Sequence, residues 1–123
     1  MIVVPVDLGD RSYDVVVGDG AHHELARFVP SSARRVAIVT QPGVPITVDP
    51  GIEHQVFEIG IGEEHKSLAT IEALCRGFAQ WGLTRADCVV AVGGGIVTDT
   101  AGFAAASYHR GLPVLHVATT LLA

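Results

Sequence analysis

The 123-residue sequence predicts an α/β fold: a mostly parallel sheet with helices on both faces, preceded by an N-terminal β-hairpin. Short apolar segments alternate along the chain with segments whose apolar residues follow helical spacing. One apolar run, residues 88–92, passes directly into three glycines and an alanine-rich segment, which is the order of a strand, a tight turn and a helix. Because 49% of the residues are hydrophobic, the chain can bury the core of one domain.

The N-terminal hairpin is predicted from two segments rich in β-branched residues. Residues 2–6 and 13–17 flank a Gly-Asp pair that is typical of a turn. Residues 20–28 then have helical character and end before a proline. This part of the chain is therefore expected to contribute an edge pair of strands and one helix.

The main sheet is predicted from four short apolar runs and the helices between them. The runs are residues 36–40, 55–59, 88–92 and 113–117. Residues 67–81 carry apolar side chains at helical spacing and stop at Gly82, and residues 96–108 form a further helix. Strands that alternate with helices in this way favour a parallel, doubly wound sheet. Ligands of such sheets bind at the carboxyl ends of the strands.

Three polar or glycine-rich segments follow predicted strands, at residues 40–43, 93–99 and 118–120. In the second of them, Gly93, Gly94 and Gly95 would let main-chain N–H groups approach a bulky anion. The positive end of the following helix would strengthen binding there, so the turn could hold a phosphate without a lysine. The alternative is a tight turn that needs glycine only for its backbone angles.

Composition and charge exclude several classes of function. With a formal net charge of −5, the chain lacks the clustered basic side chains that nucleic-acid binding needs. No apolar stretch reaches the roughly 20 residues that span a bilayer, and the N-terminus does not resemble a secretory signal. Cys75 and Cys88 show no metal-binding spacing, so we expect reduced thiols and a cytoplasmic location. The six histidines likewise show no spacing typical of a metal site.

Lys66, the only lysine of the chain, enters a predicted helix after the segment Gly-Glu-Glu-His. It could pair with Glu63 as a local surface ion pair. Alternatively, the two side chains could bind opposite sides of a ribose, because a compact ammonium suits hydroxyl groups and phosphate.

Four further residues carry side chains that suit a ligand. Asp99 lies in the first turn after the glycines, where it could accept a hydroxyl hydrogen bond or cap the helix. Arg110 follows that helix and could bind an anionic substrate. Thr119 and Thr120 end a strand, where their hydroxyls could reach a ligand or cap a helix. No general base can be read from the spacing, and no residue is assigned a catalytic role.

Four stretches in the same order resemble the N-terminal part of the 3-dehydroquinate synthase family, within the sugar phosphate cyclase group. They read LGDRSYDVVVG at residues 8–18, GEEHKSL at 62–68, GGGIVTDTAGFAAASYHRG at 93–111 and TTLLA at 119–123. The resemblance implies that residues 1–123 form a Rossmann-like NAD-binding domain of a two-domain subunit, usually a homodimer. The family's C-terminal helical domain, which supplies the ligands for Zn²⁺ or Co²⁺, has no counterpart in these residues.

The resemblance also implies an activity. The family converts the sugar phosphate 3-deoxy-D-arabino-heptulosonate 7-phosphate to 3-dehydroquinate and phosphate in the shikimate pathway, using NAD⁺ transiently. These 123 residues alone would then be inactive. The alternatives are another sugar phosphate cyclase, such as a 2-epi-5-epi-valiolone synthase, or a non-catalytic nucleotide-binding module.

Matching motif positions give the site that the resemblance implies. Arg110 would bind the substrate. The residues that would contact NAD are Glu63, Lys66, Gly94, Gly95, Ile96, Asp99, Thr119 and Thr120. No metal ligand is expected among them.

Overall fold

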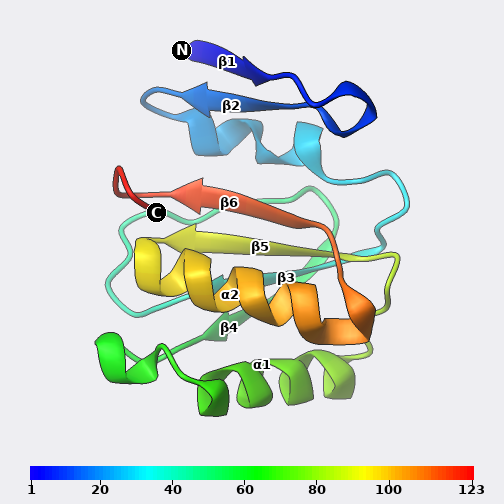
Figure 1. Cartoon of the computed structure of the whole chain (residues 1–123), viewed down its shortest axis with the longest axis vertical. Helices are drawn as coiled ribbons and strands as arrows, with labels where there is room; N and C mark the ends of the chain where they lie inside the picture. Colours follow the sequence, from blue (N-terminus) through cyan, green and yellow to red (C-terminus); the bar gives the residue numbers. More distant parts are fainter.

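A four-stranded parallel sheet forms the centre of the computed structural model, which describes residues 1–123 (Figure 1). Its order is β4-β3-β5-β6, formed by β3 (Arg35–Thr40), β4 (Glu53–Glu58), β5 (Cys88–Gly93) and β6 (Val114–Ala118). The predicted parallel sheet is confirmed. β4 begins two residues before the predicted strand because Glu53 pairs with Arg35, whose guanidinium lies 3.2 Å from the Glu53 carboxylate. Strand pairing, and not the apolar run alone, sets this boundary.

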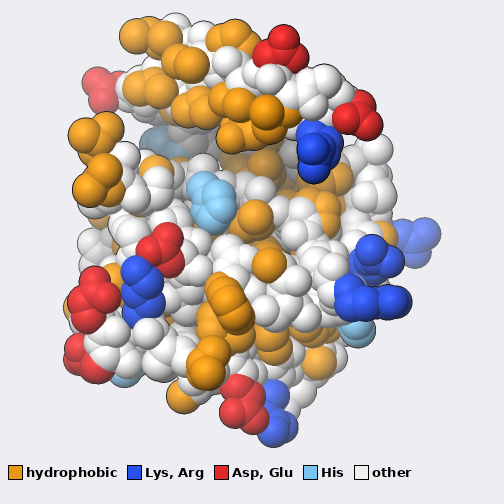
Figure 2. Space-filling view, viewed as in Figure 1, with side chains coloured by type: hydrophobic (Ala, Val, Ile, Leu, Met, Phe, Trp, Pro, Cys, Tyr) orange, Lys and Arg blue, Asp and Glu red, His pale blue; other side chains and the backbone are white.

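The predicted hairpin is also confirmed, as a separate two-stranded sheet. β1 (Ile2–Val6) pairs antiparallel with β2 (Tyr13–Val17), and the short 3₁₀ helix η1 (Gly9–Arg11) lies in their connection. Neither strand pairs with the main sheet. Hydrophobic side chains gather over this part of the surface in Figure 2. The exposed ones are Ile2, Val3, Val4, Tyr13, Val15 and Val17.

Two α-helices cover one face of the main sheet, α1 (Leu68–Trp81) and α2 (Gly95–Ser107). The Ser67 hydroxyl caps the start of α1 by accepting from the Thr70 amide, and Gly82 ends it in a left-handed conformation with φ of +87°. The 3₁₀ helix η4 (Tyr108–Arg110) follows α2. The fully buried Phe78 of α1 packs edge-on against Tyr108 and Phe57.

The opposite face of the sheet is covered by the 3₁₀ helix η2 (Ala21–Phe28) and by the connection between β3 and β4. Leu25 of η2 is buried against the face that carries Ile38 and Val90. The helical character predicted for residues 20–28 is therefore present as a 3₁₀ helix. Neither α-helix combines the length and apolar character that a bilayer-spanning segment needs.

A buried carboxylate joins the starts of two neighbouring strands. Asp87, which is 3% exposed, precedes β5 and accepts hydrogen bonds from the Arg34 and Arg35 amides at 3.0 and 3.1 Å. Its second oxygen accepts from the amide and hydroxyl of Thr84 at 2.8 and 3.1 Å. Burial acts to raise the pKa of Asp87, but the four hydrogen bonds outweigh it and the pKa is lowered.

We expect Gly93→Ala to destabilise the fold by about 2 kcal/mol. Gly93 ends β5 with φ of +153°, and a Cβ atom there would lie 2.8 Å from a methyl group of the buried Val97. The clash lies inside the core, so it cannot be relieved by moving a flexible chain end. Urea denaturation would measure the loss, and an unchanged free energy of unfolding would contradict this reading of the turn.

Candidate nucleotide-binding site

The carboxyl ends of the strands meet at one edge of the main sheet, where the order of connections reverses. After β3 the chain continues to β4 on one side, and after β5 it continues to β6 on the other. Thr40 at the end of β3 donates its hydroxyl to the Val92 carbonyl at 2.9 Å, and the Thr119 amide donates to Gly93 at 2.9 Å. This point of reversal is where parallel α/β sheets bind ligands.

The glycine turn presents unpaired main-chain donors at this edge. Gly94 is the N-cap residue of α2 and supplies no side-chain hydrogen bond. The amides of Gly95, Ile96 and Val97 begin the helix and meet no acceptor within the chain. Three amides at the positive end of a helix form a cradle for an anion.

The fold needs only the first of the three glycines. Gly93 has φ of +153°, whereas neither Gly94 nor Gly95 has a positive φ. A Cβ atom at Gly95 would meet nothing within 4 Å, and one at Gly94 would lie 3.4 Å from the Thr120 methyl group. A tight turn therefore explains Gly93 but not the other two. Space kept free over the helix N-terminus explains Gly94 and Gly95.

Lys66 and Asp99 form an ion pair that the sequence analysis missed. The Lys66 ammonium lies 2.7 Å from the Asp99 carboxylate and joins the end of η3 (Glu63–His65) to α2. The hydrogen bond and the charge of Asp99 raise the pKa of Lys66, and Glu63 adds a smaller effect of the same sign. No Glu63–Lys66 ion pair forms. The two side chains of the pair remain 42% and 58% exposed, so they contribute little to stability and stay accessible to a ligand.

Thr119 and Thr120 lie beside the glycine turn. Both are exposed and follow β6, and Thr120 is the nearest neighbour of Gly94 across the turn. Ile96 lies in the first turn of α2 and is only partly buried.

Arg110 lies at the other end of α2. Thirteen helical residues separate the two ends, a rise of roughly 20 Å. His109 and Arg110 both adopt left-handed backbone angles, with φ of +47° and +65°. Arg110 borders a pocket of about 230 Å³ with Thr84, Arg85 and His109. The structure therefore does not bring Arg110 together with the other predicted site residues.

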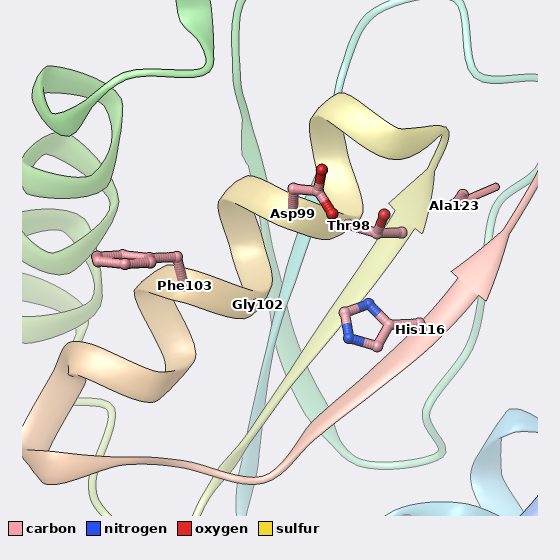
Figure 3. Close-up of a pocket in the computed structure, with 6 residues that line it drawn as sticks. All are labelled: Thr98, Asp99, Gly102, Phe103, His116 and Ala123. Carbon is pink, nitrogen blue, oxygen red and sulfur yellow. The ribbon is translucent and has the colours of Figure 1, made fainter.

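A second pocket lies directly beside Asp99 and was also missed. It is an open depression of about 440 Å³, lined by Thr98, Asp99, Gly102, Phe103, His116 and Ala123 (Figure 3). Asp99, Gly102 and Phe103 share one face of α2, since they are three and four residues apart. This spacing was visible in the sequence. The contribution of His116 was not, because it comes from β6.

No metal site accompanies this arrangement. No group of three or more histidine, cysteine, aspartate or glutamate side chains lies close enough together to hold a metal ion. The residues present thus offer main-chain donors for an anionic group at the glycine turn, but no set of side chains that would hold a metal ion.

The family is decided by a match over more than half of the chain. The family model described as "3-dehydroquinate synthase N-terminal" matches residues 56–123. The chain belongs to the 3-dehydroquinate synthase family. The recognised resemblance and the predicted fold class are confirmed.

Two curated relatives match almost the whole chain. A protein of Amycolatopsis mediterranei named "Putative aminodehydroquinate synthase" is 46% identical over 98% of this chain and 34% of its own length. The 3-dehydroquinate synthase of Pelobacter propionicus is 39% identical over 100% of this chain and 37% of its own length. The chain thus spans about a third of the length of the curated relatives it matches.

Solved structures of sugar phosphate cyclases share the fold. A 2-deoxy-scyllo-inosose synthase, complexed with carbaglucose-6-phosphate, NAD⁺ and Co²⁺, is 25% identical with a TM-score of 0.85. The match covers 97% of this chain and 35% of that one. ValA, a 2-epi-5-epi-valiolone synthase from Streptomyces hygroscopicus with NAD⁺ and Zn²⁺ bound, is 27% identical with a TM-score of 0.68, covering 94% and 35%.

Proposed function

We propose that these residues form the NAD-binding part of an enzyme that converts 3-deoxy-D-arabino-heptulosonate 7-phosphate to 3-dehydroquinate and phosphate. The observation that carries the proposal is the cradle at the start of α2, where the amides of Gly95, Ile96 and Val97 are unpaired and Gly95 leaves the space above them free. The NAD⁺ found in the related cyclase structures supports this choice of ligand.

Each predicted contact has a chemical role in this proposal. The amides of the glycine turn bind the diphosphate, with Gly94, Gly95 and Ile96 closest. Asp99 accepts from ribose hydroxyls, while Lys66 and Glu63 bind the same sugar from the η3 side. Thr119 and Thr120 donate hydroxyl hydrogen bonds from beside Gly94. Arg110, at the far end of α2, is proposed to bind anionic substrate groups away from this cradle.

When bound, NAD⁺ would supply a transient oxidation of a substrate alcohol to a ketone, which makes the neighbouring C–H acidic enough for phosphate to be eliminated, and the hydride would return to the ketone afterwards. The side chains of this chain orient that dinucleotide, and no cluster here holds the metal of the family's reaction. We therefore propose that these 123 residues bind NAD⁺ but do not turn over substrate by themselves.

The identity of the sugar phosphate is a separate question. The similarity to a protein named for aminodehydroquinate favours an amino analogue as the second candidate substrate, and a 2-epi-5-epi-valiolone synthase reaction is the third. The nucleotide cradle is common to all three proposals. Assays of the corresponding full-length enzyme with each sugar phosphate would separate them.

Calorimetric titration with NAD⁺, combined with a phosphate-release assay, tests the proposal. We expect saturable binding of one NAD⁺ per chain and no phosphate release from the heptulosonate substrate. Absence of NAD⁺ binding would contradict the nucleotide role. Phosphate release at rates typical of an enzyme would contradict the claim that further residues are needed.

We expect Lys66→Ala to weaken NAD⁺ binding about tenfold, because it removes a charged hydrogen-bond donor to the ligand. The melting temperature should change little, since the Lys66–Asp99 pair is exposed. Arg76→Ala is the matched control, because Arg76 also forms an exposed ion pair, with Glu72 at 3.0 Å on α1. Equal NAD⁺ affinities in Lys66→Ala and Arg76→Ala would contradict a ligand contact by Lys66 and would leave it as an ordinary surface residue.

A further inference from the structure

His116 contributes the β6 wall of the pocket beside Asp99 (Figure 3). Its ring lies against α2 where that helix carries Gly102, and a Cβ atom at position 102 would be 3.4 Å from the imidazole. Glycine at this position therefore lets the ring approach the helix backbone. Thr98 and Asp99 lie on the next turn of the same face.

Asp99 carries the only charged side chain among the residues that line this pocket with His116, and the two side chains form no ion pair in the structure. Asp99 is also the only charged residue of α2, and the neighbouring strand β5 places the small, uncharged Ala91 directly opposite His116. The main sheet ends at β6, so no further strand brings a charge against the ring. Loss of water around the ring lowers the pKa of His116, while the Asp99 charge acts in the opposite direction. Lys66 already pairs with Asp99 from the η3 side.

We propose that His116 is a positioning residue that couples anion binding at the glycine turn to pH, by competing with Lys66 for the Asp99 carboxylate. A neutral His116 leaves Lys66 and Asp99 paired, and the site then carries no net charge from these three groups. When His116 is protonated, its positive charge offsets the negative charge of Asp99. The Lys66 ammonium is then free to bind an anionic ligand. This inference rests on the proposed dinucleotide function for its ligand.

Because ligand binding and protonation of His116 are thermodynamically linked, the direction in which affinity changes with pH can be stated. A ligand with negative charge favours the protonated imidazole, so its affinity rises as pH falls through the His116 pKa. Because that pKa lies below its usual range, the rise is expected on the acidic side of neutrality. We expect NAD⁺ to bind about threefold to tenfold more tightly at about pH 5.5 than at about pH 8.

NMR titration of the histidine ring protons tests the coupling without any ligand. The His116 signal is assigned by its loss in His116→Gln. In Asp99→Asn the opposing charge is removed, so the His116 pKa should fall further, by about half a unit. A His116 pKa that is the same in the wild type and in Asp99→Asn would overturn the inference.

Titration with NAD⁺ across the same pH range tests the consequence. His116→Gln should lose the pH dependence and keep the affinity seen at high pH, because glutamine is polar but does not titrate. His54→Gln is the matched control, since His54 lies on β4 at the opposite edge of the sheet. Identical pH profiles for the wild type and His116→Gln would overturn the inference.

The two proposals fail in distinguishable ways. If NAD⁺ does not bind at any pH, the proposed function is wrong, and inorganic pyrophosphate replaces NAD⁺ as the probe. A wild-type pyrophosphate profile that differs from that of His116→Gln would then keep this inference. Identical pH profiles of pyrophosphate affinity in the wild type and in His116→Gln, or no pyrophosphate binding at all, would overturn the His116 inference as well.

Discussion

Gly95→Val is expected to weaken NAD⁺ binding by at least about 100-fold while changing the free energy of unfolding by less than about 1 kcal/mol. Gly95 has no positive φ, and nothing lies within 4 Å of the position that its Cβ atom would take. The fold therefore accepts a side chain there. A valine side chain would occupy the space above the unpaired amides that begin α2.

Gly93→Ala provides the contrast for this experiment, because its Cβ atom would collide with Val97 in the core and lower stability. Calorimetry with NAD⁺ and urea denaturation on both variants separate the two roles of glycine. A Gly95→Val protein that binds NAD⁺ as tightly as the wild type would mean that the glycines serve only the turn. The nucleotide proposal would then lose its main support.

Asp87→Ala is expected to destabilise the fold by about 3 kcal/mol, a large part of the stability of a small domain. The substitution removes the acceptor of four hydrogen bonds and leaves the amides of Arg34, Arg35 and Thr84 unpaired. These amides lie in the segments that lead into β3 and β5, so the loss affects the centre of the main sheet. Urea denaturation measures the change.

Asp49→Ala is the matched control, because Asp49 accepts one local hydrogen bond, from the Gly51 amide in an exposed turn. Its loss should cost less than about 1 kcal/mol. Equal stabilities for the two alanine variants would contradict the role assigned to Asp87.

The Asp87 carboxylate also predicts a pH dependence of stability. Its pKa is lower in the folded chain than in the unfolded chain, so its contribution is fully present above the unfolded pKa. That contribution is lost as pH falls below the unfolded pKa and through the folded one. Stability should therefore decline on the acid side in the wild type, and decline less steeply in Asp87→Asn.

The parts of the fold that local sequence determines could be predicted. α1 has apolar residues at helical spacing and Gly82 at its end, as predicted, and Ser67, which was expected inside the helix, caps its start instead. The strand that enters the glycine turn was equally clear, since a run of apolar residues leads into Gly93. The connection between β3 and β4 carries no helix, so local patterns gave no sign of where β4 lies in the sheet.

The long-range features of the site could not be predicted from local patterns. Lys66 and Asp99 are 33 residues apart and meet only because β5 and α2 follow β3 across the sheet. His116 was set aside because its sequence neighbours suggest no metal, yet the fold places its ring against Gly102. Arg110 follows α2 directly, so the length of that helix alone separates it from the residues at the helix start. The Lys66–Asp99 pair and the position of His116, by contrast, depend on tertiary placement, which residue spacing does not encode.

A crystal structure of the chain with NAD⁺ is the most direct test of the central claim, that main-chain amides at the start of α2 hold a dinucleotide diphosphate. We predict diphosphate oxygens within hydrogen-bond distance of the Gly95 and Ile96 amides, with Asp99 beside a ribose. NAD⁺ bound elsewhere on the chain, with no ligand atom over the glycine turn, would contradict the account.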